Sequence, residues 1–314
     1  MDIANTGLYD GATATAEACP LASRVTRRRA IALLEPVHAN VLDVIRTYAF
    51  GASLEVKVVR SPDSVDDDCT CLVVQQPNIL GTIVDITSLS KAAHDRGALL
   101  VAMTYPFALG LLRPPGEAGA DIVTGEGRDL AGPLNFGGPG LDIFAAKQPF
   151  MRQMPGRIVG RTNEVAEGPN GEPPRTGYVL TLQAREQFIR TERAPSNFST
   201  VQALGADSLR RMAELCYQKA HHAADMIGAL SGYQVVEPGP WFQEFLVRGP
   251  VPAQALLKRL RAHGIEPGLD VSQRPEPEAS GALLVCVTEA TTVGDIKSLV
   301  AALRAVREDA ERAN

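Results

Sequence analysis

Residues 119–157 decide the fold, and they read GADIVTGEGRDLAGPLNFGGPGLDIFAAKQPFMRQMPGR. A short apolar strand at Ile122 and Val123 leads into a glycine-rich turn, and the string FGGPG follows at 136–140. Glycines this close together let one backbone approach another backbone, or a ligand, where a Cβ atom would clash. The stretch therefore predicts either a tight structural crossing between two strands or a ligand held against the backbone.

Strands and helices alternate on both sides of this stretch. On its N-terminal side the pattern predicts strands at 29–34, 54–59, 71–75 and 98–102, a helix ending near 48 and a helix at 86–96. This spacing predicts a mainly parallel sheet, covered by helices on both faces and joined by right-handed crossovers. On its C-terminal side we expect a β-excursion with a polar tip at 167–174, strands at 177–182, 242–247 and 283–287, and helices at 206–227, 253–263 and 293–307.

Composition and charge exclude several classes of function. The 314 residues include 36 Asp and Glu against 31 Lys and Arg, and the basic cluster at 27–29 is short, so we expect no nucleic-acid partner. No apolar run reaches the length of a membrane span, so we expect a soluble, cytoplasmic protein without a membrane partner. The five cysteines lack the spacing of a zinc site, so we expect no metal and interpret them as reduced thiols, mostly in the core.

Four further strings, together with the central stretch, carry a resemblance to a known family. They are IANTGLYDGAT at 3–13, ALGLLRPPG at 108–116, LQAREQFIR at 182–190, and Ser196-Asn197. In this order they resemble subunit 1, the N-terminal half, of the glycine cleavage system P-protein (glycine dehydrogenase, decarboxylating). Compared with that family the chain is divergent, is shortened at its N-terminus, and has a shorter stretch between Ser196-Asn197 and Leu209.

The resemblance implies the fold of pyridoxal-phosphate (PLP) enzymes. It implies an α/β, aspartate-aminotransferase-like (fold type I) large domain with a mainly parallel sheet, followed by a small α/β C-terminal domain. We expect the large domain, with a degenerate cofactor site, at 1–200 and the small domain at 201–314. Ligands in such sheets bind beyond the carboxyl ends of the strands.

A PLP enzyme of this fold needs a Schiff-base lysine, a carboxylate beside the pyridinium nitrogen and a ring stacked on the cofactor. The resemblance implies that these three positions fall at Arg128, Tyr105 and His38. Arginine stays protonated and cannot act as an amine nucleophile, so we expect a pseudo-site with no catalytic residue and no PLP on this chain. Asn78 also follows a strand and is expected beside this pseudo-site. The other interpretation is that Arg128 and Tyr105 simply fill a dead pocket and pair with Glu126 or Asp129.

Two more segments are candidate binding or interface elements. Asp10, Gly11, Ala12 and Thr13 form a turn and a helix start, where backbone amides attract anions; the resemblance implies the position of the cofactor phosphate, and an ordinary capped helix is the alternative. The second segment is expected to form an interface or to support the site. Alternatively, it is a solvent-exposed helix with Arg–Glu pairs and an ordinary helix cap. Its residues are Arg185, Glu186, Gln187, Arg190, Ser196 and Asn197.

Two functions remain open from the sequence. The first is a non-catalytic partner subunit that completes the active site of a PLP-bearing, subunit 2-like chain of a glycine decarboxylase-like enzyme. A lipoyl H-protein-like carrier would be a further partner, and recruitment to a specialised pathway is a variant of this interpretation. The second is a stand-alone protein that uses the pseudo-site to bind an anionic ligand or for PLP-independent chemistry.

Overall fold

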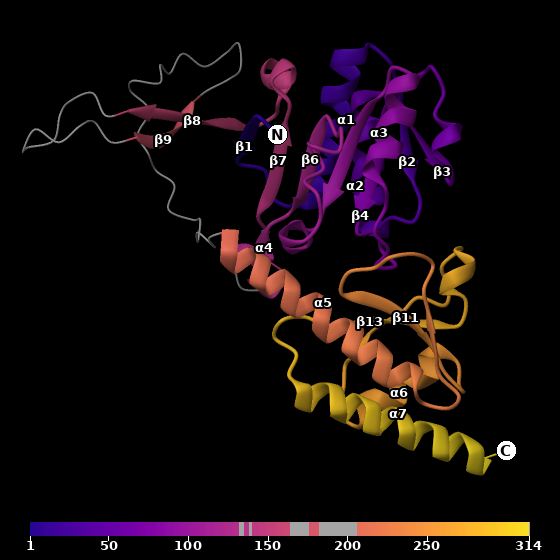
Figure 1. Cartoon of the computed structure of the whole chain (residues 1–314). Helices are drawn as coiled ribbons and strands as arrows, with labels where there is room; N and C mark the ends of the chain where they lie inside the picture. The colour runs from indigo at the N-terminus through magenta and orange to yellow at the C-terminus, as the bar shows by residue number, and fades with distance from the viewer. Residues whose placement is uncertain (132–134, 138–139, 164–175, 182–205, 314) are drawn as a thin grey trace, which may run out of the picture. The chain divides into compact units, whose positions relative to one another are not determined.

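The computed structural model describes residues 1–131, 135–137, 140–163, 176–181 and 206–313. The chain divides into two compact units (Figure 1). The first contains Met1–Gln75, Asp85–Pro106 and Arg113–Ala203, and the second contains Gln76–Val84, Phe107–Leu112 and Leu204–Asn314. The expected boundary between residues 200 and 201 stays a prediction.

A nine-stranded sheet in the order β3-β2-β4-β5-β6-β7-β1-β8-β9 forms the framework of the first unit. Strand β2 pairs in parallel with β3 and β4, and β5 pairs in parallel with β6. The strands are β1 (Ile3–Thr6), β2 (Ala30–Leu34), β3 (Glu55–Val59), β4 (Cys69–Gln76), β5 (Leu99–Thr104), β6 (Ile122–Glu126), β7 (Asp142–Ala146), β8 (Arg157–Asn163) and β9 (Thr176–Thr181). The strands predicted before residue 126 are therefore confirmed.

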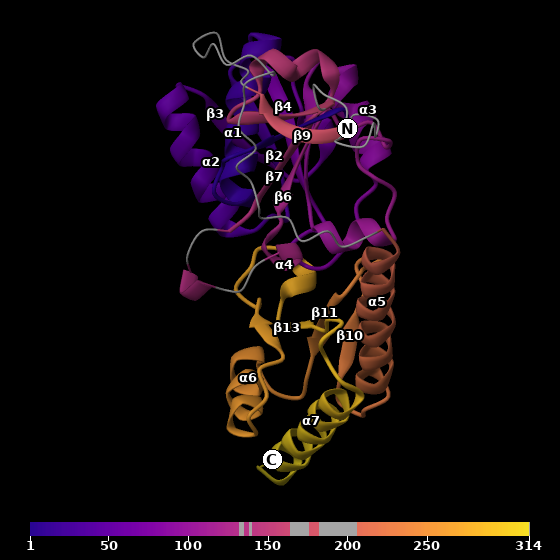
Figure 2. The ribbon, with the colours of Figure 1, turned by 90° about the vertical axis from the view of Figure 1, so that its left-hand side faces the viewer.

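Helices cover both faces of the parallel part of this sheet. Figure 2 shows α1 (Gly11–Thr26) and α2 (Ala39–Ala52) on one side and α3 (Ile86–Asp95) on the other. Helix α1 can lie close to the sheet because its buried face consists mostly of small residues, among them Ala14 and Ala18. The hydroxyl of Thr15 lies 2.7 Å from that of Thr124 on β6, which joins the first turns of α1 to the strand.

The central glycine-rich stretch connects β6 to β7 and reverses the chain. Strand β7 runs antiparallel to β6, with Gly125 opposite Ile143, and β1 then pairs antiparallel with both β7 and β8. The connection includes the short helix α4 (Arg128–Ala131). The stretch thus links two paired strands, and the choice between a tight crossing and a ligand held against the backbone stays open. Strand β1 was not predicted from the sequence.

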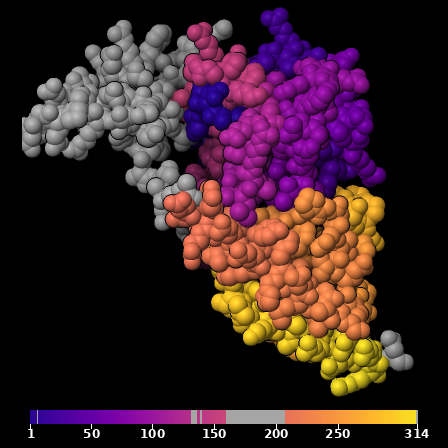
Figure 3. Space-filling model, viewed as in Figure 1, coloured from indigo at the N-terminus to yellow at the C-terminus, as the bar shows by residue number. Residues whose placement is uncertain are grey.

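The second unit is built on an antiparallel sheet in the order β10-β11-β13-β12. Phe245 and Leu283 lie on the face that packs against the helices, and Leu246 and Leu284 lie on the opposite face with Leu80. The elements are α5 (Ala206–Gly228), β10 (Gln234–Val236), β11 (Glu244–Arg248), α6 (Ala253–Ala262), β12 (Gly268–Asp270), β13 (Ala282–Cys286) and α7 (Val293–Ala313). In the space-filling view the orange atoms of α5 and the yellow atoms of α7 lie at the surface of this unit (Figure 3).

Three further expectations concern the whole chain. Four cysteines are buried and free, as predicted, and Cys286 is exposed. Among the helices that the structure describes, none has the length and apolar character needed to cross a membrane. Within the same residues, no group of three or more His, Cys, Asp or Glu side chains could hold a metal ion.

Candidate functional site

The carboxylate of Glu126 joins three segments of the first unit at the carboxyl end of β6. Its Oε2 atom accepts a hydrogen bond from the backbone N–H of Gly11 at 3.2 Å. Its Oε1 atom accepts from the backbone N–H groups of Arg128 and Leu141, each at 2.9 Å. The last residue of β6 is thereby connected to the start of α1, the start of α4 and the residue before β7.

The first turn of α1 is capped by side chains of this chain. Asp10 is the N-cap residue, and its Oδ1 accepts from the N–H of Thr13 at 2.7 Å. The N–H of Ala14 donates to the carbonyl oxygen of Asp10 at 2.9 Å. With Gly11 bonded to Glu126, the amides of residues 11, 13 and 14 all have partners within the protein. These contacts are those of an ordinary capped helix, which was one of the two interpretations of this segment. The other interpretation, a phosphate position at 10–13, stays a prediction.

Glycine is required where the backbone segments of this site approach one another. A Cβ atom on Gly11 would lie 2.6 Å from the backbone nitrogen of Glu126, and one on Gly125 would lie 2.4 Å from the carbonyl oxygen of Thr104. A Cβ atom on Gly140 would instead meet a side chain, the carboxylate of Glu126, with Oε2 at 2.6 Å. Contacts below 3.0 Å require something to move, so the glycines predicted to allow close approach do so here.

The three pseudo-site residues all lie in the first unit. His38 is the N-cap of α2, where its Nδ1 accepts from the N–H of Asn40 at 3.1 Å and its own N–H donates to Oε1 of Gln75 at 2.9 Å. Tyr105 is half-buried directly after β5. Arg128 opens α4 and is half-buried, and its Nε is buried without a hydrogen-bond partner in the described part of the chain.

The other predicted residues are Asn78 and the six residues of the interface segment, and their roles stay predictions. Asn78 belongs to the second unit, where its Oδ1 accepts from the N–H groups of Leu80 and Thr82 at 2.9 and 3.1 Å and so stabilises a turn. The six residues of the predicted interface segment lie outside the described residues, and they are Arg185, Glu186, Gln187, Arg190, Ser196 and Asn197.

Asp142, directly after Leu141, carries a perturbed carboxyl group beside Glu126. Burial raises the pKa of Asp142 to about 6, the backbone N–H groups of Asp142 and Leu8 lower it, and the charges of Glu126 and Asp10 raise it further. Its Oδ2 atom is buried and has no hydrogen-bond partner among the described residues. The Asp142 carboxyl is therefore held in the protonated form more readily than usual, mainly because it is buried and to a smaller extent because the carboxylate of Glu126 lies nearby.

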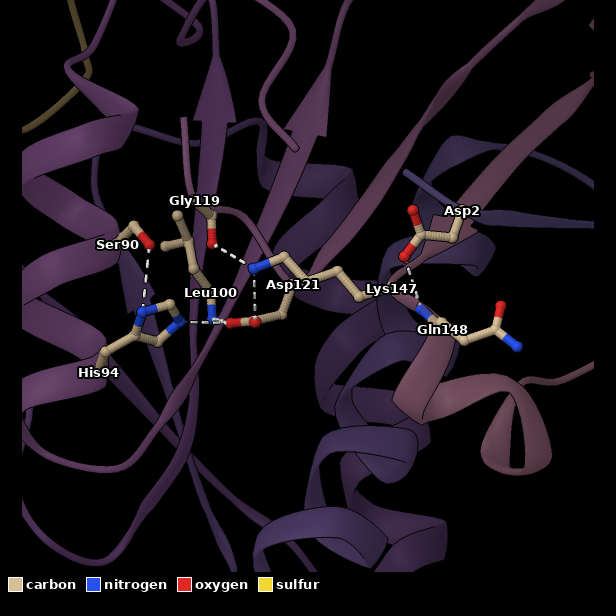
Figure 4. Close-up of polar contacts among 8 residues, drawn as sticks. All are labelled: Asp2, Ser90, His94, Leu100, Gly119, Asp121, Lys147 and Gln148. Carbon is tan, nitrogen blue, oxygen red and sulfur yellow. Dashed lines mark hydrogen bonds and ion pairs between the residues drawn. The ribbon is translucent and has the colours of Figure 1, made fainter. Parts of the chain in front are cut away.

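A second polar cluster lies at the opposite, amino end of β6 (Figure 4). The Nζ of Lys147 lies 3.2 Å from Oδ1 of Asp121 and 3.1 Å from the carbonyl oxygen of Gly119. The Nε2 of His94 lies 2.6 Å from Oδ2 of Asp121, which also accepts from the N–H of Leu100 at 2.9 Å. This cluster joins α3, β5, β6 and β7, and its charged groups are already paired with one another.

Sequence reasoning named Glu126 only as a possible partner of Arg128 or Tyr105 in a dead pocket, and it missed Asp121. Glu126 stands between two glycines directly after an apolar strand, which could have indicated a carboxylate bound to closely approaching backbone amides. Asp121 immediately precedes the same strand, and Lys147 immediately follows its neighbour β7. Pairing between them could be predicted only once the antiparallel register of β6 and β7 was known.

Comparison with known proteins agrees with this architecture. A family model described as "Glycine cleavage system P-protein" matches residues 1–303. A relative from Desulforamulus reducens, named "Probable glycine dehydrogenase (decarboxylating) subunit 1", is 39% identical, and the match covers 98% of this chain and 72% of the relative. A relative with the same name from Thermomicrobium roseum is 41% identical, with 97% of this chain and 71% of the relative covered.

Solved structures give the same result for the fold. A crystal structure of glycine decarboxylase (P-protein) of the glycine cleavage system, in inhibitor-bound form, is similar with a TM-score of 0.81 and 34% identity, over 98% of this chain and 72% of that one. A NifS-like protein with 14% identity and a TM-score of 0.63, over 96% of this chain and 82% of that one, shares the fold alone. The predicted α/β fold of PLP enzymes is thus confirmed for the sheet, and so is the resemblance found in the sequence. The chain belongs to the glycine cleavage system P-protein family.

Proposed function

We propose that this chain is the non-catalytic partner subunit of a two-subunit glycine decarboxylase-like enzyme. The observation that carries the proposal is the match of 98% of the chain to relatives named subunit 1 of glycine dehydrogenase (decarboxylating). A protein named subunit 1 has at least one further subunit, and in this proposal that subunit is a PLP-bearing, subunit 2-like chain. This chain then completes the active site of its partner.

The residues at the carboxyl end of β6 do not fit a PLP site. A phosphate group at the start of α1 would need free backbone amides, but the N–H groups of Gly11 and Thr13 are bonded to Glu126 and Asp10. Arg128 stands where the resemblance implies the Schiff-base lysine, and an arginine cannot form an imine with the cofactor. We therefore propose that PLP, which supplies an electron sink for decarboxylation, is bound by the partner and not by this chain.

The lysines of this chain support the same proposal. Lys147 is the nearest in sequence to the glycine-rich stretch, but its Nζ is held by Asp121 and Gly119 at the other end of β6. Lys57 and Lys91 form surface ion pairs with Asp66 and Asp95, and Lys219 donates to the carbonyl oxygen of Glu289. Lys258 and Lys297 belong to helices of the second unit.

Two measurements test this proposal. Purified chain is incubated with PLP, reduced with borohydride and analysed by mass spectrometry, and we expect no stoichiometric lysine adduct. Release of carbon dioxide from glycine is then measured with this chain alone, with the subunit 2-like chain alone and with both, and we expect full activity only from the mixture. A stoichiometric adduct on one lysine of this chain, or equal activity without it, would overturn the assignment.

Two finer parts of the proposal are the location of the complex and its carrier, and the carrier is tested by a separate experiment. We propose a cytoplasmic complex in which a lipoyl H-protein-like carrier receives the aminomethyl group of glycine. With both subunits present, addition of lipoylated carrier is expected to raise the rate of carbon dioxide release, and unlipoylated carrier serves as the control. Equal rates with the two carriers would contradict this part of the proposal and leave the subunit assignment intact.

A further inference from the structure

We propose that the Glu126 carboxylate is a built-in anion, which occupies the position that an anionic ligand group would take at the start of α1. In this state the site is closed to free phosphate, and removal of the carboxylate opens it. This inference goes beyond the subunit assignment, because it rests only on contacts within the first unit.

The donors around Glu126 form an arrangement suited to an anion. They are backbone N–H groups from three segments, at Gly11, Arg128 and Leu141, within 2.9–3.2 Å of the two carboxylate oxygens. Gly11 is the first residue of a 16-residue helix, whose N-terminal end carries a partial positive charge. Hydrogen bonds from N–H groups to a carboxylate are stronger than those to a neutral acceptor, so the three segments are held together by one charged group.

The backbone at Gly11 and Gly140 packs closely against Glu126. A Cβ atom on Gly140 would lie 2.6 and 2.7 Å from the two carboxylate oxygens, and one on Gly11 would lie 2.6 Å from the backbone nitrogen of Glu126. Side chains at these positions would therefore displace Glu126 or the strand that carries it. Truncation of Glu126 while both glycines are kept would leave a space lined by three N–H donors.

Charges near the site explain why the native protein would exclude an external anion. Asp10 and Asp142 flank Glu126, and the charges of Glu126 and Asp10 both favour the protonated form of Asp142. A phosphate ion would have to displace one carboxylate and enter beside two more. Once Glu126 is truncated one negative charge is gone, and a cationic residue remains two positions further along the chain: Arg128, whose buried Nε has no hydrogen-bond partner in the described residues.

The experiment compares the wild type with Glu126→Ala in the presence of inorganic phosphate. Melting temperatures are measured against increasing phosphate, with ionic strength held constant by chloride. We expect Glu126→Ala to melt several degrees below the wild type and to regain much of the loss, saturably, as phosphate increases, while the wild type does not respond. Glu117→Ala, which removes an exposed glutamate of the same unit, is expected to behave as the wild type.

Glu126→Gln keeps the test decisive if the alanine variant does not fold. The glutamine side chain still fills the space but carries no charge, so we expect a lower melting temperature and no response to phosphate. The proposal is overturned if phosphate stabilises the wild type as much as the alanine variant, if the folded alanine variant shows no response, or if the glutamine variant melts like the wild type.

Discussion

The Nζ of Lys147 and the Oδ1 of Asp121 lie 3.2 Å apart at the amino end of β6, whereas Arg128 follows the carboxyl end of the same strand. The lysine closest in sequence to the glycine-rich turn is thus held at the opposite end of strand β6 from that turn. The Asp121 side chain is only 7% exposed, so Lys147 neutralises a buried carboxylate. Its place in the fold indicates a role in stability.

Replacement of Lys147 by methionine is expected to lower the free energy of unfolding by about 2 kcal/mol, because a buried carboxylate loses one of its partners. The remaining contacts of Asp121 with His94 and Leu100 keep the loss below that of a fully isolated charge. Urea unfolding measures the change. Lys91→Met is the matched control, since its pair with Asp95 is exposed and is expected to contribute less than about 0.5 kcal/mol. Equal losses in the two variants would refute the assigned role of Lys147.

A lysine at position 128 is not expected to create a cofactor site. In Arg128→Lys the amine needed for an imine is present, but Glu126 and Asp10 still occupy the amides of α1 that a cofactor phosphate would need. We therefore expect no PLP adduct after borohydride reduction, as in the wild type, when the peptides are analysed by mass spectrometry. Stoichiometric modification of residue 128 would show that the missing lysine alone prevents cofactor binding.

Asp142 is expected to make stability depend on pH in the acidic range. Its pKa rises from an ordinary value of 3.8 to about 6 in the folded protein, so folding favours the protonated form. This contribution to stability is fully present below about pH 4 and is lost as the pH rises through 6. Between about pH 4 and pH 8, Asp142→Asn is expected to gain about 1 kcal/mol relative to the wild type, a value reduced for solvent screening at a half-buried site.

Denaturant unfolding of both proteins across this pH range measures that difference. Asp129→Asn serves as the control, because Asp129 is an exposed carboxylate near the same turn. The interpretation is wrong if the wild type and Asp142→Asn change in parallel with pH.

Glu244 in the second unit is expected to show a similar effect at higher pH. Burial raises the pKa of Glu244 from 4.5 to about 7, and a hydrogen bond with Cys286 lowers it in part. Its stabilising effect is present below about pH 4.5 and is lost as the pH rises through 7, so Glu244→Gln should gain on the order of 2 kcal/mol relative to the wild type over this range. Unfolding titrations measure the gain, and Cys286→Ala should move the transition to higher pH. An unchanged profile in Glu244→Gln would exclude this group as the cause.

Gly125 tests the close approach of β5 and β6. In Gly125→Ala the new Cβ would lie 2.4 Å from the carbonyl oxygen of Thr104, so we expect a loss of about 3 kcal/mol or more because backbone must move. Gly51→Ala, in helix α2 with no atom within 4 Å of its Cβ position, is expected to gain up to about 1 kcal/mol instead. Thermal unfolding compares the two, and a loss of similar size in both would contradict this account of Gly125.

Local patterns were sufficient to predict many elements. A strand was predicted at 54–59 and β3 spans Glu55–Val59, and a helix was predicted at 86–96 and α3 spans Ile86–Asp95. In contrast, β1 was missed because it is short and pairs with β7 and β8, which lie far along the chain. Pairing between distant strands leaves no periodic signal in a four-residue segment.

The candidate site shows the same division. From residue identity alone, the sequence determined the family, the helix start at Asp10–Thr13 and the need for close backbone approach at the glycines. Only the tertiary structure decided that Glu126 binds the amides at α1 and before β7. Gly11 is 115 positions away from Glu126 and Leu141 is 15 positions away, and the partners of a carboxylate depend on which amides the folded chain brings within hydrogen-bonding distance.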